Sequence, residues 1–201
     1  MKTNQTKIQR LVGLAILAAL VIVLQNFVAI PLGMFTVTLT LVPIMIGAIL
    51  FGPSGGAFLG AVFGAVVSVQ VVTGAAGLYP TLMLQHTPVV TILICMLKGT
   101  LAGFVSGLLY KPFAKGSKRL LGTILSAVAC PIVNTGIFSL GLAVFYSALV
   151  NSWALENGYA NAFTFILFFM IGLNFVVEFA INVLLIPVVL RVIDIVKKRF
   201  A

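Results

Sequence analysis

The stretch TLVPIMIGAILFGPSGGAFLGAVFGAVVS, residues 40–68, decides the fold class. It contains no charged residue, and the short segment 52–55 (GPSG) divides it into two apolar runs. Runs rich in Leu, Ile, Val, Phe and small residues are typical of helices in a lipid bilayer. A transmembrane barrel would instead show segments of about 10 residues in which apolar and polar positions alternate. The stretch therefore predicts two membrane helices joined by a tight turn.

The rest of the chain has the same character. Of its 201 residues, 62% are hydrophobic and only 7% are charged, which is too little charge to cover a water-soluble domain. The net charge of +9 does not indicate nucleic-acid binding, because the cations gather at the ends of the apolar runs. We predict an all-α integral membrane protein of the cell membrane, built as one domain of six transmembrane helices. The expected helices are residues 8–30, 38–51, 56–73, 87–110, 120–150 and 161–190.

The positions of Lys and Arg predict the orientation of these helices. Cytoplasmic loops carry an excess of cations. Here cations precede the first helix, lie between the fourth and fifth, and follow the sixth, whereas the expected outer loops contain no Lys or Arg. Both termini are therefore predicted to be cytoplasmic, with the first apolar run retained as a helix rather than cleaved as a signal peptide. Trp153 and Tyr159 in the last outer loop are expected to anchor at the membrane interface.

Several polar residues are expected at one depth inside the membrane. Lys98 lies 13 residues before Lys111, and Glu178 lies 13 residues before Arg191, so each should lie roughly 20 Å from the inner face. Polar side chains in lipid are costly and normally face the interior of a helix bundle. The same estimate places three amide side chains in this layer, those of Gln25, Gln70 and Asn134.

Two interpretations of Lys98 and Glu178 remain open. They could form a structural ion pair between the fourth and sixth helices. Alternatively, Lys98 could bind an anionic group of a substrate while Glu178 accepts a hydrogen bond from it. The two interpretations are compatible if the ion pair opens when the substrate binds. We predict a substrate site made by this layer and by the outer segment before the fourth helix. Its expected residues are Lys98, Glu178, Asn134, Asn174, Gln70, Gln85, His86 and Tyr79.

Small residues recur every four positions in three places. Such rows let helix backbones approach closely in lipid. We expect the two glycine rows to pack inside the fold. Ala15 and Ala19 form a shorter pair on an otherwise bulky first helix, and this pair is equally suited to internal packing and to docking a partner subunit. The two glycine rows are Gly52, Gly56, Gly60, Gly64 with Ser68, and Gly99, Gly103 with Gly107.

The sequence lacks the usual signs of an enzyme. No GxxxxGK[ST] motif is present, so the chain has no P-loop for ATP. His86 is the single histidine, which excludes paired-histidine metal sites. Residues 52–56 match GxSxG, but that elbow requires a strand-to-helix turn in a soluble sheet, and His86 is expected across the membrane from Ser54. We therefore expect no catalytic residue, metal or cofactor. The alternatives to a binding subunit are an autonomous secondary carrier or channel and, less favoured, an intramembrane serine enzyme.

Several stretches together resemble a known family. They are residues 40–68, CMLKGTLAGFVSGLLYK at 95–111, and CPIVNTGIFSLG at 130–141, along with the basic N-terminus and the Ala15–Ala19 pair. In this order they are similar to the substrate-binding S component of energy-coupling factor (ECF) transporters. The region IPLG to GPSGG, residues 30–56, is similar to the pantothenate-type branch.

The resemblance implies a division of labour. An S component captures a vitamin or a similar micronutrient near the outer face, while a transmembrane T component and two ATP-binding-cassette ATPases supply the energy. Ala15 and Ala19 match the family's AxxxA pattern, which packs on the T component. The segments 31–37 and 74–86 correspond to the outer loops that cover the ligand in the family.

Overall fold

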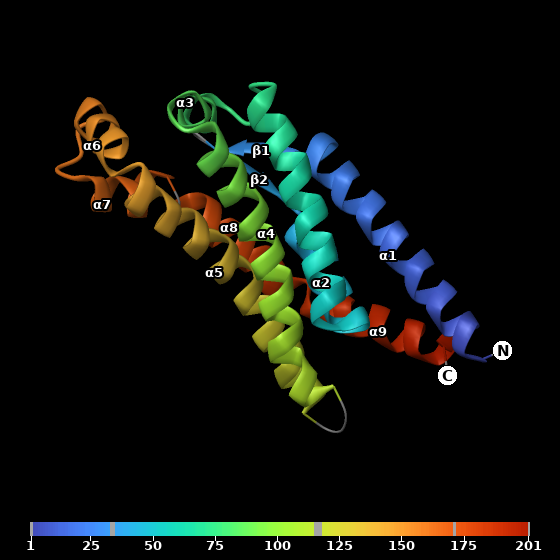
Figure 1. The fold of residues 1–201 in the computed structure, drawn as a ribbon. Helices are drawn as coiled ribbons and strands as arrows, with labels where there is room; N and C mark the ends of the chain where they lie inside the picture. The colour runs from blue at the N-terminus through green and yellow to red at the C-terminus, as the bar shows by residue number, and fades with distance from the viewer. Residues whose placement is uncertain (1, 33–34, 115–117, 171, 201) are drawn as a thin grey trace.

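The computed structural model describes residues 2–32, 35–114, 118–170 and 172–200. The long helices lie side by side, and the shorter elements gather at the end away from the chain termini (Figure 1). In chain order the elements are α1 (Lys2–Phe27), β1 (Ala29–Leu32), β2 (Phe35–Thr38), α2 (Leu41–Val72), α3 (Leu78–His86), α4 (Pro88–Tyr110), the 3₁₀ helix η1 (Lys111–Phe113), α5 (Arg119–Phe145), α6 (Ser147–Glu156), α7 (Ala162–Thr164), the π-helix η2 (Phe165–Met170), α8 (Gly172–Leu184) and α9 (Ile186–Phe200).

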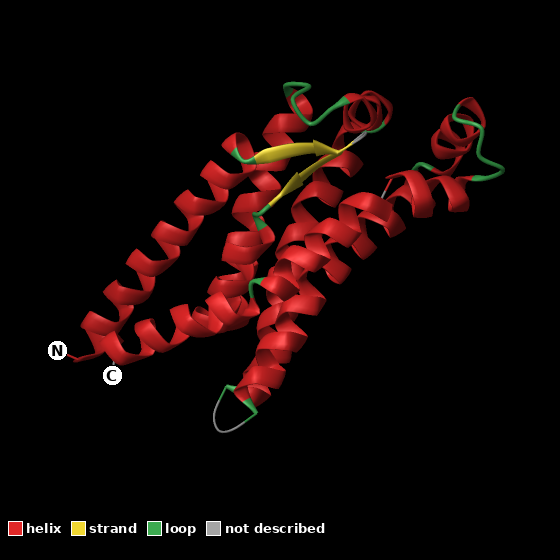
Figure 2. Ribbon diagram, turned by 180° about the vertical axis from the view of Figure 1, so that it is seen from behind, coloured by secondary structure: helices red, strands yellow, loops and turns green. Residues whose placement is uncertain are grey.

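The predicted all-helical membrane class is confirmed, with one addition. Strands β1 and β2 form an antiparallel hairpin in which Ala29 lies opposite Thr38. The hairpin crosses the helices near the end opposite the termini (Figure 2). Its second strand, Phe35–Thr38, consists of one aromatic and three β-branched residues, types that favour extended backbone. The segment expected as an outer loop after the first helix is therefore a short sheet.

Helix α2 consists of two arms that fold back on each other at Gly52. Gly52 has φ 79° and ψ −174°, a conformation that breaks the helix just before Pro53. A Cβ atom added at Gly47 would meet the side chain of Leu59, and one added at Gly56 would lie 2.7 Å from the Cβ of Ala48. In a straight helix Gly47 and Leu59 would be roughly 18 Å apart. The arms 41–51 and 53–72 are therefore an antiparallel hairpin, and its turn falls at the GPSG segment.

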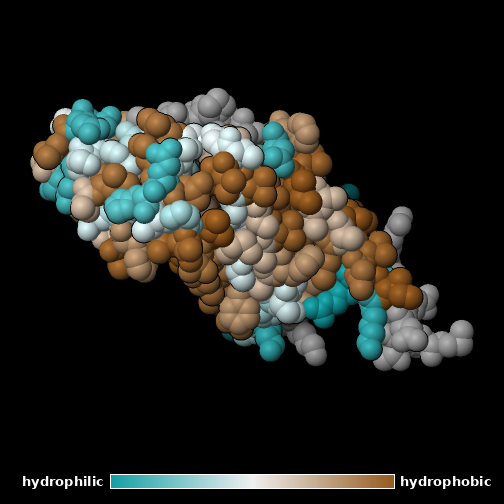
Figure 3. Space-filling view, turned by 45° about the horizontal axis from the view of Figure 1, so that its top comes forward, coloured by the Kyte–Doolittle hydropathy of each residue, from teal (hydrophilic) through white to brown (hydrophobic). Residues whose placement is uncertain are grey.

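The structure contains several helices able to cross a membrane. Four described helices are long and apolar enough, namely Lys7–Phe27, Leu41–Val72, Pro88–Phe113 and Arg119–Phe145, and the pair Phe175–Leu184 and Ile186–Val196, bent by 47°, is a candidate fifth span. The folded-back α2 is counted once in this total. Hydrophobic side chains cover the band between the ends of the face shown in Figure 3, and hydrophilic ones gather at the ends. The count of six spans and the cytoplasmic side of both termini stay predictions.

The last third of the chain is more broken than the sequence predicted. The helix expected over residues 120–150 ends at Phe145, and the separate helix α6 follows it. Within α5 the helix continues without a break through Pro131. The expected helix 161–190 is divided among α7, η2, α8 and α9. Pro187 is the second residue of α9, where its missing N–H is tolerated, so it starts a new helix after the bend instead of continuing α8.

Close packing of α2 on α4 forms the centre of the fold. A Cβ atom added at Gly60 would meet the carbonyl oxygen of Gly99, and one added at Gly103 would meet that of Gly56. At Gly64 an added Cβ would lie 2.7 Å from the carbonyl oxygen of Cys95. The prediction that the glycine rows pack internally is thus confirmed. The rows fix the position of α4, and with it the position of Lys98.

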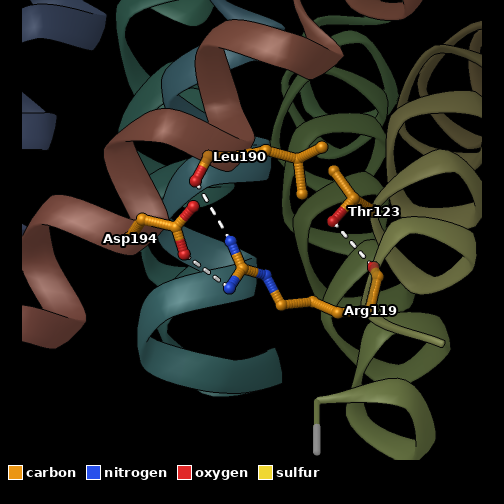
Figure 4. A network of polar contacts seen from close by, with 4 residues as sticks. All are labelled: Arg119, Thr123, Leu190 and Asp194. Carbon is orange, nitrogen blue, oxygen red and sulfur yellow. Dashed lines mark hydrogen bonds and ion pairs between the residues drawn. The ribbon is translucent and has the colours of Figure 1, made fainter. Parts of the chain in front are cut away.

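Helix α9 is tied to the start of α5 by Arg119 (Figure 4). Arg119 Nη1 donates to Asp194 Oδ1 at 2.7 Å, and Nη2 donates to the carbonyl oxygen of Leu190 at 3.1 Å. Thr123 donates to the carbonyl oxygen of Arg119 at 3.0 Å. Beside this contact, Ile186 of α9 packs into an apolar cluster with residues of α2, α4 and α5. The last helix is therefore held on the bundle at the end where the termini lie.

The predicted orientation can be tested with two introduced cysteines. Ser54 is exposed at the α2 turn and Ser152 is exposed on α6, while the native Cys95 and Cys130 are buried and give little background. We expect a membrane-impermeant maleimide to label Ser152→Cys in intact cells, and to label Ser54→Cys only after the membrane is broken. Labelling of Ser54→Cys from outside would show that the assigned orientation is wrong.

Candidate functional site

Lys98 points into the bundle from α4. Its Nζ lies 5.6 Å from the ring centre of Phe63 on α2 and 5.0 Å from that of Phe138 on α5. A cation within about 6 Å of an aromatic ring is attracted to the ring face. The side chain is half-buried. Lys98 therefore reaches the junction of three helices instead of extending along the lipid surface.

Glu178 on α8 is buried and makes no ion pair with Lys98. Glu178 is 6% exposed, and its Oε2 atom has no hydrogen-bond partner among the described residues. The two charges interact electrostatically. However, the one ion pair with N–O within 4.0 Å among the described side chains joins Arg119 and Asp194. The interpretation in which Lys98 and Glu178 lock two helices together is therefore not what the structure shows.

Two further buried amides lie in the same group. Asn134 on α5 is 7% exposed and Asn182 on α8 is 1% exposed, and within the described part of the chain the Oδ1 atom of each has no hydrogen-bond partner. The Nδ2 of Asn182 donates to the carbonyl oxygen of Glu178 at 2.9 Å. Asn134 lies one helical turn before Phe138, on the face of α5 that meets Lys98. Buried oxygens without a donor are rare and costly, so these three, taken together with Lys98, mark a candidate site.

The other two residues of the predicted polar layer pair with each other. Gln25 Nε2 donates to Gln70 Oε1 at 2.9 Å, and Gln70 Nε2 donates to the carbonyl oxygen of Gln25 at 3.1 Å. Thr40 donates to Gln25 Oε1 at 3.0 Å. In this structure Gln70 thus holds α1 against α2. A role of Gln70 in binding stays a prediction.

The expected outer segment 74–86 is largely a helix packed on α6. The ring of Tyr79 lies 4.6 Å from that of Trp153, and its hydroxyl accepts a hydrogen bond from Asn157 at 3.2 Å. Trp153 is only 4% exposed, because its ring packs inside an apolar cluster with Tyr79 and Phe165. The prediction that Trp153 anchors at the membrane interface is therefore wrong. Gln85 and His86 are exposed at the end of α3. Their part in binding stays a prediction.

Asn174 is the remaining predicted site residue. Its backbone belongs to α8, one turn before Glu178, but its side chain lies outside the described part of the structure. Its place in the site therefore also stays a prediction.

Ala15 and Ala19 lie on the face of α1 that points away from the other helices, and both are exposed. The opposite face of this helix packs on α2, where Val21 is fully buried and Gly13 faces the ring of Phe51. Internal packing of the alanine pair is therefore excluded. Docking of a partner subunit stays a prediction.

Three members of the site were absent from the predicted set. Asn182 lies four residues after Glu178, so the sequence already places it on the same face of the sixth expected helix as Asn174 and Glu178, although it was not among the expected site residues. Phe63 and Phe138 carry no such signal, because the sequence contains 16 Phe in similar apolar surroundings. They are identified only by their position beside Lys98.

Comparisons with known proteins agree with this architecture. The family model described as "ECF transporter, substrate-specific component" matches residues 9–190. The solved structure of ThiT from Listeria monocytogenes is similar, with a TM-score of 0.64 and 19% sequence identity over 97% of this chain and 98% of that chain. At this identity the likeness shows the fold alone. No curated protein matches the chain in sequence.

The family match and the apolar helices lead to the same conclusion. They establish a multi-pass protein of the cell membrane. The assignment to the pantothenate-type branch stays a prediction. Because the family model covers most of the chain, the protein belongs to the family of substrate-specific components of ECF transporters.

Proposed function

We propose that this protein is the substrate-capture subunit of an ECF-type uptake transporter for a vitamin or similar micronutrient. It binds a small water-soluble solute near the outer face and delivers it with a T component and two ATPases. The observation that carries this proposal is Lys98, which reaches the rings of Phe63 and Phe138 between the helices and has no carboxylate within 4.0 Å among the described side chains. Charged side chains inside a membrane bundle are expensive and are typically kept for a ligand or a transport step.

The division of labour is supported by what the chain carries and lacks. It has no P-loop motif, so energy from ATP has to come from other subunits. Ala15 and Ala19 are exposed on α1 among bulky apolar side chains such as Ile16 and Leu20. A small-residue pair lets a partner helix approach closely in lipid. We propose this face of α1 as the docking site for the T component.

Uptake into proteoliposomes tests the proposed function. The probe is an equimolar mixture of the water-soluble vitamins, and internal vitamins are measured by mass spectrometry. We expect ATP-dependent accumulation of one vitamin when this chain is reconstituted with the T component and ATPases of the same cell, and none when it is reconstituted alone. Accumulation by the chain alone would instead support an autonomous secondary carrier or channel.

A further inference from the structure

We infer that the ligand of this site is an acid that also carries at least two N–H or O–H donors, bound with its anionic group at Lys98 and its donors at Glu178, Asn134 and Asn182. This inference rests on the proposed function and narrows it to a substrate class.

The Lys98 end of the site calls for an anion. An ammonium group has three N–H donors and no acceptor. Its described neighbours are the ring faces of Phe63 and Phe138, which attract a cation but offer no oxygen or nitrogen acceptor. No carboxylate among the described side chains lies within 4.0 Å of it, Glu178 included. A ligand carboxylate would supply both the missing acceptors and the opposite charge.

The opposite end of the site calls for donors. Among the residues whose side chains are described, Glu178 Oε2, Asn134 Oδ1 and Asn182 Oδ1 are buried oxygens without a hydrogen-bond partner, on residues that are at most 7% exposed. Ionised carboxylate oxygens and amide oxygens can only accept hydrogen bonds. A ligand that offered acceptors here would leave all of these oxygens unsatisfied. A second acidic group would in addition be repelled by Glu178.

Other buried oxygens of the chain do not carry the same information. The hydroxyls of Tyr110 and Ser126 also have no partner. A hydroxyl can either donate or accept, so it does not select the chemistry of a neighbour. The amide and carboxylate oxygens of Asn134, Asn182 and Glu178 do select it, because they accept and do not donate.

Thermal stability of the purified protein with individual water-soluble vitamins tests this class. Pantothenate and biotin combine a carboxylate with N–H or O–H donors. Nicotinate has the carboxylate alone, pyridoxine and riboflavin have donors without an acid, and thiamine is a cation. We expect Tm to rise with a vitamin of the first kind only, because a ligand stabilises the state that binds it.

The acid is then compared with its own neutral amide. Wild type should bind the acid at least about tenfold more tightly than the amide, since a hydrogen bond to a charged group is lost. Lys98→Met should remove this preference, whereas Lys98→Arg should retain part of it. Asn134→Leu should weaken both compounds by a similar factor of at least about ten, because it removes one acceptor and no charge.

The outcomes separate the inference from the proposed function. Stabilisation by thiamine, riboflavin, pyridoxine or nicotinate would overturn the ligand class and leave vitamin capture standing. An unchanged acid-to-amide ratio in Lys98→Met would also overturn the class. Stabilisation by no vitamin would overturn both the class and the proposed function.

Discussion

Replacing Lys98 with Met is expected to weaken ligand binding strongly while the protein remains folded. Methionine keeps the length and the apolar contacts of the side chain between Phe63 and Phe138, but it removes the charge. A hydrogen bond to a charged group contributes about 1.5–3 kcal/mol, so the affinity should fall by roughly 10- to 150-fold. Isothermal titration of wild type and of Lys98→Met with the vitamin that raises the Tm of wild type measures this loss.

Lys111→Met is the matched control for this experiment. Lys111 is exposed just after α4, beyond the buried segment that carries Lys98. The same change of charge and chemistry there should leave the affinity within about twofold of wild type, because surface charge effects are small. Equal binding by wild type and Lys98→Met would mean that Lys98 has no contact with the ligand.

The largest effect on stability is expected from Gly60→Ala. The added methyl group would meet the carbonyl oxygen of Gly99, which belongs to the backbone of α4 and cannot rotate away. Overpacking of this kind costs about 1–3 kcal/mol, and separation of α2 from α4 would displace Lys98 as well. A chain of this length loses roughly 2–4 °C of Tm per kcal/mol, which a thermal melt in detergent resolves.

Gly136→Ala on α5 provides a control with the opposite expected sign. A Cβ atom added at Gly136 would meet nothing within 4 Å. Alanine is a better helix former than glycine by about 1 kcal/mol, so Gly136→Ala should leave Tm unchanged or raise it slightly. If both variants lose stability equally, the close contact between α2 and α4 is not what holds the bundle together.

The features that could be predicted from the sequence are those with a local pattern. Apolar runs and rows of glycine predicted the helical membrane class and internal packing, and Gly60 and Gly103 confirm the packing. The hairpin β1–β2 was missed because its strands are only four residues each. The bend of 47° before α9 was missed because residues 161–190, with Pro187 near their end, were predicted as one helix.

The site was only partly predictable because depth and direction are different quantities. Counting residues from the predicted cytoplasmic ends of the helices placed Lys98, Glu178 and Gln70 in one layer, but it gave no information on which way each side chain points. In the structure Gln70 turns toward Gln25 on α1, whereas Lys98 turns toward Phe138 on α5. Direction depends on how the helices are rotated against each other, which only the packing of the whole bundle determines.

The most direct test of the account is mass spectrometry of small molecules released from gently purified wild type and Lys98→Met. The account predicts close to one molecule of a single vitamin per wild-type chain, and none from an equally folded Lys98→Met. Two results would contradict it: a wild type that carries no vitamin after growth in vitamin-rich media, or the same vitamin in equal amount in both proteins.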